Sequence, residues 1–207
     1  MDGLIEQTKT QIWKIINELS SANKNNKNVT IQVSLFEYGK STISVNENYL
    51  RMLVPLTNDL DDLSEKLFNL KTNGRGEFAG AVILSSINRL NWSNHKDNLK
   101  LILISGNESF NQGNVDYKFA IKKATDNNII VNTIFCGDFN TGVNFQWKTA
   151  ADIGNGKYMN ISQNDTVKIY NTKYDNKINI LGNKLNDTYI SYNKKSEMRI
   201  LNKKNKI

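Results

Sequence analysis

The side chains best placed for chemistry are Asn107 and Glu108, which directly follow a buried apolar segment. Residues 99–104 are almost entirely Leu and Ile, and the run stops at Ser105 and Gly106. Continuous apolar residues are typical of a strand inside a parallel sheet that has helices on both faces. In such sheets the ligand crevice lies just beyond the carboxyl ends of the strands. Asn107 and Glu108 are therefore expected where a ligand would bind.

Glu77 is a second loop carboxylate that could contribute to such a site. It closes the glycine-bearing loop 72–77. Glu77 and Glu108 could hold a cation or accept a Lys or Arg of a partner, although solvated loop carboxylates that do neither are the commoner case. The stretch Gly74-x-Gly76 is too short to cradle a phosphate and lacks the Lys-Ser/Thr that follows in a P-loop.

The sequence does not support catalysis by Cys and His. The only His, His95, lies in the polar connection 93–98 and is expected to be exposed. The only Cys, Cys136, ends an apolar run and is interpreted as a small core residue. Trp92 and Trp147 are interpreted as core or rim residues, and Trp147 is near enough to the loops to anchor a partner. No catalytic, cofactor-binding or metal-ligating residue is predicted.

The net charge of +7 is concentrated at the end of the sequence. Residues 193–207 hold six Lys or Arg against Glu197, a charge of +5, so the other 192 residues carry only +2. A basic tail on a near-neutral domain lacks the folded basic face of a nucleic-acid reader, so a solvated tail is predicted and nucleic-acid binding is not expected. No stretch reaches the ~20 apolar residues that span a bilayer. The first residues lack the basic and apolar regions of a signal peptide, and the sequence does not predict a compartment.

Hydrophobic periodicity predicts strands that alternate with helices. Helices are expected at 3–23, from a cap at Thr57 or Asn58 to residue 70, and at 78–92, 115–127, 145–153 and 174–189; strands at 29–36, 49–54, 99–104, 129–135 and 157–161; loops at 20–28 and 139–144. The strand at 49–54 is predicted to be an edge strand, because Pro55 has no N–H for a ladder. The pattern predicts one α/β domain with a doubly wound, mostly parallel sheet flanked by helices on both faces.

One element of such a sheet is missing from the pattern. Doubly wound sheets normally begin with a central strand that delivers the first binding loop, whereas this sequence begins with a helix. The expectation is that the first central strand lies outside this chain.

Several segments, in their order and spacing, resemble landmarks of bacterial von Willebrand factor type A domains. They are Met1-Asp-Gly-Leu-Ile-Glu-Gln-Thr-Lys, Leu56-Thr-Asn-Asp-Leu-Asp, Asn73-Gly-Arg-Gly-Glu-Phe, Val115-Asp-Tyr-Lys, Asn132-Thr-Ile-Phe-Cys-Gly-Asp and Gly156-Lys-Tyr-Met-Asn-Ile. The resemblance covers residues 1–192 and leaves 193–207 as a basic, flexible tail. It implies a Rossmann-like sheet with a metal-ion-dependent adhesion site on its upper face, protein binding and no catalysis. Family members are often secreted or in the cell envelope.

The resemblance also implies that this metal site is degenerate. The first family loop, Asp-x-Ser-x-Ser followed by Met, would precede Met1 and so lie outside the chain. The second loop normally supplies a Thr, but the matching stretch is Gly74-Arg-Gly-Glu77, and the Asp of the third loop is matched by Asn107. A hard cation such as Mg²⁺ prefers several oxygens in a near-octahedral array, so Mg²⁺ is expected only in a full-length parent. A protein partner of unknown identity is expected on the face formed by Arg75, Glu77, Asn107 and Glu108.

The functional hypothesis is a non-enzymatic interaction or adhesion-type domain. One alternative is a small α/β hydrolase or nucleotide-binding enzyme, which is disfavoured because no nucleophile elbow or glycine fingerprint follows a strand. Another is a weak nucleic-acid binder that acts through the basic tail. The family's strand order, 3-2-1-4-5-6, further implies that strands 29–36 and 99–104 flank the missing one. They are expected to stay unpaired with each other, which would leave the chain marginally stable.

Overall fold

The computed structural model describes residues 2–24, 27–71, 74 and 76–162, all within the unit Met1–Thr166. Its elements are, in order, α1 Asp2–Ser20, β1 Asn23–Lys24, β2 Lys27–Asn28, β3 Val33–Tyr38, η1 Val45–Glu47, β4 Leu50–Thr57, α2 Leu60–Phe68, α3 Ala79–Arg89, β5 Lys100–Gly106, α4 Tyr117–Asp126, β6 Ile129–Cys136, α5 Phe139–Asn144, α6 Trp147–Ile153 and β7 Tyr158–Ile161. The predicted helix 174–189, the domain end at 192 and the tail 193–207 lie outside the described residues.

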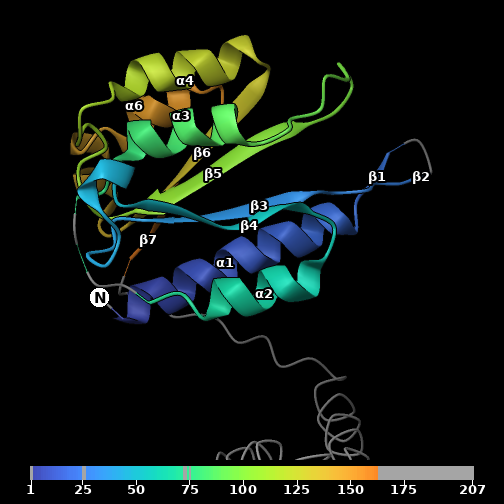
Figure 1. The fold of residues 1–207 in the computed structure, drawn as a ribbon, viewed down its shortest axis with the longest axis horizontal. Helices are drawn as coiled ribbons and strands as arrows, with labels where there is room; N and C mark the ends of the chain where they lie inside the picture. Colours follow the sequence, from blue (N-terminus) through green and yellow to red (C-terminus); the bar gives the residue numbers. More distant parts are fainter. Residues whose placement is uncertain (1, 25–26, 72–73, 75, 163–207) are drawn as a thin grey trace, which may run out of the picture. The chain divides into compact units, whose positions relative to one another are not determined.

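The strands form three separate sheets, β1–β2, β3–β4 and β5–β6–β7, and the last two lie between helices (Figure 1). β5 pairs in parallel with β6 along its whole length, from Lys100 opposite Ile129 to Gly106 opposite Phe135, and β7 joins the other edge of β6. β3 and β4 form an antiparallel pair. Helices α3, α4 and α6 lie on one side of the strands, and α1 and α2 lie on the other. The predicted α/β class, with a mostly parallel sheet between helices, is confirmed.

Two apolar clusters hold these layers together. The larger one packs α3, α4 and α6 against β5 and β6, and its most buried members include Ile83, Ala120 and Val131. The smaller one lies between α1, α2 and the β3–β4 pair, around Val54 and Leu63. Gly80 allows α3 to approach the segment before α4, because a Cβ at this position would overlap the carbonyl oxygen of Val115.

Helix α1 contacts both the end of β6 and the end of α2. Thr8 Oγ1 lies 3.1 Å from Cys136 Sγ, at the end of β6. Lys9, which is almost fully buried, donates from Nζ to the carbonyl oxygen of Phe68, 3.1 Å away at the end of α2. A buried ammonium needs such partners, and Lys9 also pairs with Glu6. Helix α1 therefore fixes the end of β6 relative to α2.

Several predicted boundaries are wrong for identifiable reasons. The predicted loop 139–144 is helix α5, because the Asp138 carboxylate accepts from the N–H of Thr141 and caps the first turn. The cap of α2 is Asp59, whose carboxylate accepts from two backbone N–H groups, instead of Thr57 or Asn58. The predicted loop 20–28 contains the short β1–β2 pair.

The two longer antiparallel strands also differ from their predicted ranges. β3 begins at Val33 and continues to Tyr38, two residues beyond the predicted end. β4 continues through Pro55 to Thr57. Pro55 lies where the register between the two strands shifts. Among the described strands β4 pairs with β3 alone, which agrees with the predicted edge position.

The ladder is interrupted between β3 and β5. In the part of the chain that the structure describes, no backbone hydrogen bond joins these two strands, and they belong to separate sheets. This agrees with the expectation that strands 29–36 and 99–104 do not pair. The expected marginal stability remains a prediction.

Candidate functional site

The loop after β5 is held by a carboxylate from a distant part of the chain. Glu77 Oε2 accepts from the backbone N–H of Asn107 at 2.9 Å and from that of Glu108 at 3.2 Å. Glu77 precedes α3, while the two amides follow directly on β5. The two N–H groups lie just past the end of β5 and have no partner in the sheet. One carboxylate oxygen of Glu77 thus accepts a hydrogen bond from each of them.

Gly106 makes room for this carboxylate at the end of β5. A Cβ there would overlap Glu77 Oε2 and would come within 2.8 Å of the Tyr38 hydroxyl and 2.9 Å of the Trp147 ring. Tyr38, at the end of β3, donates from its hydroxyl to the carbonyl oxygen of Ser105 at 2.6 Å. The absence of a side chain at Gly106 therefore lets three side chains converge on the loop.

Burial changes the titration of both groups that hold the loop. Burial raises the pKa of Glu77, and the two N–H donors lower it by less. Burial also raises the pKa of Tyr38 well above its usual value, with a further contribution from the negative charge of Glu77. Tyr38 therefore keeps its proton at neutral pH and remains a donor to Ser105.

Trp147 supports the loop after β5 through a hydrogen bond from its side chain. Its side chain is 1% exposed, and Nε1 donates to the carbonyl oxygen of Glu108 at 2.7 Å. The ring of Phe110, further along the loop, stands edge-on to the Trp147 ring, with the two ring centroids 4.7 Å apart. Of the two positions predicted for Trp147, core or rim, the structure shows the core position. It is too buried to anchor a partner directly.

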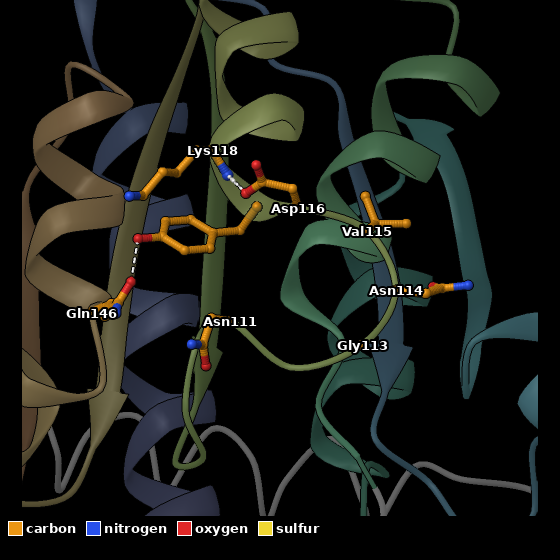
Figure 2. Close-up of a pocket in the computed structure, with 8 residues that line it drawn as sticks. Asn111, Gly113, Asn114, Val115, Asp116, Lys118 and Gln146 are labelled. Atoms are coloured by element: carbon orange, nitrogen blue, oxygen red, sulfur yellow. Dashed lines mark hydrogen bonds between the residues drawn. The ribbon is translucent and has the colours of Figure 1, made fainter.

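An open polar depression of about 490 Å³ lies next to this loop, between the segment that leads into α4 and the start of α6 (Figure 2). Its lining residues are Asn111, Gly113, Asn114, Val115, Asp116, Tyr117, Lys118 and Gln146. The Tyr117 hydroxyl donates to Gln146 Oε1, and Asp116 caps α4 by accepting from the N–H of Lys118. The depression offers amide and charged groups, which suit a polar surface of a protein more than an apolar small molecule.

Three of the four residues expected on the partner face come together in the structure. Glu77, Asn107 and Glu108 form the hydrogen-bonded unit described above, and all three are half-buried. The expectation that Glu77 is an ordinary solvated carboxylate is wrong, because its Oε2 is engaged by backbone amides. Arg75 lies outside the described residues.

Sequence reasoning missed Tyr38 and Gln146 as parts of this region. Tyr38 was missed because the strand was predicted to end at Phe36. The apolar alternation of Phe36 and Tyr38 was the signal that could have extended it. Gln146 occupies a left-handed backbone position between α5 and α6, and no local pattern in the sequence indicates its contact with Tyr117.

Among the described residues at this end of the sheet, the carboxylates of Glu77 and Glu108 already accept hydrogen bonds. The two N–H dipoles that point at Glu77 Oε2 would face a cation placed there with their positive ends. Glu108 Oε2 accepts from Gln112 Nε2 at 2.7 Å. Within the described ranges, no three His, Cys, Asp or Glu side chains cluster closely enough to hold a metal ion.

The remaining candidate residues have structural surroundings. His95 is exposed, as expected. Cys136 is half-buried beside Thr8, and burial raises the pKa of its thiol, which disfavours the reactive thiolate. None of the helices within the described ranges has the length and apolar character needed to cross a membrane.

Comparison with protein-family models gives no match, and comparison with curated proteins gives none either. Solved structures do match. The chain is similar to the conserved hypothetical protein BatB from Bacteroides thetaiotaomicron, with a TM-score of 0.57 and 14% identity over 76% of this chain and 80% of that one. It is similar to an aerotolerance-related membrane protein from Bacteroides fragilis NCTC 9343, with a TM-score of 0.53 and 15% identity over 77% and 81% of the two chains.

A third similar structure is proximal thread matrix protein 1 from the mussel byssus. Its TM-score is 0.54, with 13% identity over 78% of this chain and 39% of that one. At such identities the likeness concerns the fold alone. The described part of the chain has the fold of a von Willebrand factor type A-like domain.

Proposed function

We propose that this domain is a non-enzymatic protein-binding module whose partner face combines the segment before α3 with the loop after β5, with Arg75, Glu77, Asn107 and Glu108 as its central residues. The observation that carries the proposal is the pair of hydrogen bonds from the amides of Asn107 and Glu108 to Glu77. They give the loop a fixed backbone without a metal ion. A preorganised loop loses less conformational entropy when it binds.

In this proposal the metal site expected from the resemblance is degenerate. The Glu77 carboxylate, hydrogen-bonded to two backbone amides, organises the loop in place of a cation. Where a cation would need oxygen ligands, this loop presents two N–H groups to Glu77. The half-buried side chains of Asn107 and Glu108, together with the polar depression beside them, provide the contact surface. Such a surface suits a partner that offers hydrogen-bond donors and cationic side chains.

The first prediction concerns metal binding. We expect Mg²⁺ or Mn²⁺ to bind no more tightly than about millimolar, because a poor oxygen cage gives little affinity for hard cations. Isothermal titration calorimetry of the purified chain measures this directly. A stoichiometric site in the micromolar range would contradict the proposal of a degenerate site.

The second prediction concerns the partner face. Once a binding protein has been isolated, Glu108→Ala and Arg75→Ala should each weaken its affinity by about tenfold, the usual effect of removing an important interface side chain. Chelation by EDTA should leave the affinity unchanged. The matched control is Glu65→Ala, which removes an exposed carboxylate from α2 on the other side of the strands.

Affinities measured by calorimetry or surface plasmon resonance test this placement. Unchanged affinity in both loop variants would move the partner face elsewhere. Loss of binding on chelation would show that a metal ion mediates the contact, against the proposal.

A further inference from the structure

We propose that an aromatic patch beside the loop after β5 binds an arginine side chain of the protein partner. The patch consists of Phe139, which begins α5, Phe145, which directly follows α5, and Tyr158, which begins β7. The acidic group that would pair with the arginine is Asp138. This inference rests on the protein-binding function proposed above, because it extends the same face and names the chemistry of the partner.

Two neighbouring strands hold the rings of the patch. The Phe139 ring centroid lies 5.1 Å from that of Tyr158 in β7, and the Phe145 ring centroid lies 6.0 Å from that of Phe135 in β6. The Tyr158 hydroxyl also donates to the carbonyl oxygen of Phe139 at 2.9 Å. The Tyr158 hydroxyl and the Phe135 ring both lie against Gly142 in the middle of α5, so the two ring pairs are contiguous. The patch is therefore a preformed surface.

The two phenylalanine rings are held in place but are not covered. Phe139 is 48% exposed and Phe145 is 37% exposed, although both are large apolar side chains. Single exposed apolar side chains are ordinary on protein surfaces, whereas neighbouring ones mark interaction sites. Aromatic side chains are also among the residues enriched in protein interfaces. The exposure of both rings therefore favours a binding role for this surface.

The patch is continuous with the loop after β5. The N–H of Phe110 donates to the carbonyl oxygen of Phe145 at 2.9 Å. Trp147, two residues after Phe145, donates from Nε1 to the carbonyl oxygen of Glu108 at 2.7 Å. These two hydrogen bonds join the end of α5 to the loop. A partner segment that contacts Glu108 can therefore extend to Phe145 on the same surface.

The charged residues beside the patch are acidic. The segments 105–112 and 137–147 contain the loop after β5 and helix α5, and their charged residues are Glu108 and Asp138. The surface thus combines aromatic rings with negative charge. Interfaces bring surfaces of opposite potential together, so this combination favours a cationic side chain of the partner.

Asp138 supplies the negative charge at one end of the patch, directly before Phe139. Its Oδ1 accepts from the backbone N–H of Thr141 at 3.0 Å and from the Thr141 hydroxyl at 3.2 Å. The backbone hydrogen bond lowers the pKa of Asp138, so this exposed carboxylate is ionised at neutral pH. Burial raises the pKa of Tyr158, and the negative charge of Asp138 raises it further, which agrees with a carboxylate close to the patch.

Arginine matches both features of this surface. Its guanidinium group is planar, stacks on aromatic rings and forms two parallel hydrogen bonds with one carboxylate. The ammonium of lysine is more strongly hydrated and has no flat surface, so it suits the patch less well. The net charge of +7 disfavours non-specific attraction of a cationic peptide to this chain. Binding of such a peptide would therefore report the local aromatic and acidic groups.

The test uses the full chain and a fluorescein-labelled peptide of the sequence Gly-Ser-Leu-Arg-Leu-Ser-Gly. The control peptide has citrulline in place of arginine, which keeps nearly the same shape but carries no charge. Binding is measured by fluorescence anisotropy, and the contact surface is located by NMR chemical-shift changes at the backbone amides.

We expect the arginine peptide to shift the amide signals of residues 138–145. The citrulline peptide should bind about tenfold more weakly, because it loses both the cation–π contact and the ion pair. Asp138→Asn should weaken binding of the arginine peptide by about threefold or more, since Asn still caps α5 but removes the charge.

Phe139→Leu and Phe145→Leu should each weaken binding of the arginine peptide by about threefold to fivefold, because Leu keeps an apolar side chain but has no ring. The matched control is Phe119→Leu on α4. Phe119 is 51% exposed, and Lys123 of the same chain already lies over its ring, with Nζ 5.7 Å from the ring centroid. This control should leave binding unchanged.

Equal binding of the citrulline peptide, or unchanged binding in both variants of the patch, would overturn the inference. Nuclear Overhauser contacts in the free protein from the Phe139 and Phe145 rings to a further segment of the same chain would show an intramolecular occupant. Signal shifts at residues 138–145 that grow with protein concentration without peptide would show a second copy. Both results contradict the proposed occupant.

Failure of this inference is distinguishable from failure of the proposed partner face. Arg75→Ala tests the partner face, and Phe139→Leu with Phe145→Leu tests the patch, all with the isolated partner. Weaker partner binding in Arg75→Ala alone would keep the partner face and overturn the inference about the patch. Weaker binding in the two patch variants alone would support arginine recognition by the patch and contradict the placement of the central residues.

Discussion

Replacing Trp147 with Ala is expected to lower the free energy of unfolding by about 3–5 kcal/mol, the range typical of large aromatic side chains removed from a core. The side chain is 1% exposed. Its ring stands edge-on to that of Phe110, with the ring centroids 4.7 Å apart, and its centroid lies 5.8 Å from that of the Phe135 ring. The change would therefore leave a cavity between α6 and the sheet and would also remove the donor to the carbonyl oxygen of Glu108.

Urea denaturation followed by circular dichroism measures this loss. Trp147→Phe is the matched control, since it keeps most of the aromatic packing but cannot donate to Glu108. We expect it to cost about 1–2 kcal/mol, the usual loss for a single hydrogen bond with partial loss of packing. A loss below about 1 kcal/mol for Trp147→Ala would show that Trp147 does not support the loop and core in the way described.

Two substitutions at Glu77 should have different effects on the free energy of unfolding at neutral pH. Glu77→Gln keeps an oxygen that can accept from the amides of Asn107 and Glu108 but removes a charge whose burial is unfavourable. We expect this variant to be more stable than the natural chain. Glu77→Ala removes the acceptor and should be less stable than the Gln variant by about 1–2 kcal/mol, because two N–H groups lose their partner.

The pH dependence of the Gln effect follows from the raised pKa of Glu77. A carboxyl with a raised pKa in the folded state favours folding fully below its pKa in the unfolded chain, and this contribution is lost as pH rises through the folded pKa. The natural chain and Glu77→Gln should therefore have similar stability below about pH 4. The advantage of the Gln variant should grow as the pH rises to neutrality. Urea denaturation of both proteins across this range tests the sign, and a difference that shrinks with rising pH would contradict the burial of Glu77.

The sequence predicted the strand before the site better than the contacts within the site. Residues 99–104 form a continuous apolar run, so β5 and the loop beginning at Asn107 could be located from local pattern alone. The contact between Glu77 and the amides of Asn107 and Glu108 joins positions 30 and 31 residues apart. It depends on how α3 packs beside β5, which no local pattern determines.

Helix α5 and the end of β3 show two other limits of local pattern. Residues 139–144 include Asn, Thr and Gly, which have low helix propensity, and the helix depends on its cap at Asp138. Tyr38 continues β3 beyond Phe36 because its ring packs against the larger cluster and its hydroxyl reaches Ser105. Tertiary contacts decide both cases.

The interruption between β3 and β5 was expected from the strand order that the resemblance to von Willebrand factor type A domains implies, and the hydrogen-bond pattern of the described residues agrees with it. The stability of the chain in this state remains a prediction. A cooperative melt of the monomer at high temperature would contradict the expected marginal stability.

Amide hydrogen exchange at Asn107 and Glu108 tests the central claim, that the Glu77 carboxylate holds the loop after β5. Exchange is measured by NMR in the natural chain with EDTA, in the same protein with Mg²⁺, and in the two Glu77 variants. We predict equal protection with EDTA and with Mg²⁺, protection retained in Glu77→Gln, and exchange faster by about tenfold or more in Glu77→Ala. Protection that requires Mg²⁺, or that is unchanged in Glu77→Ala, would contradict the claim.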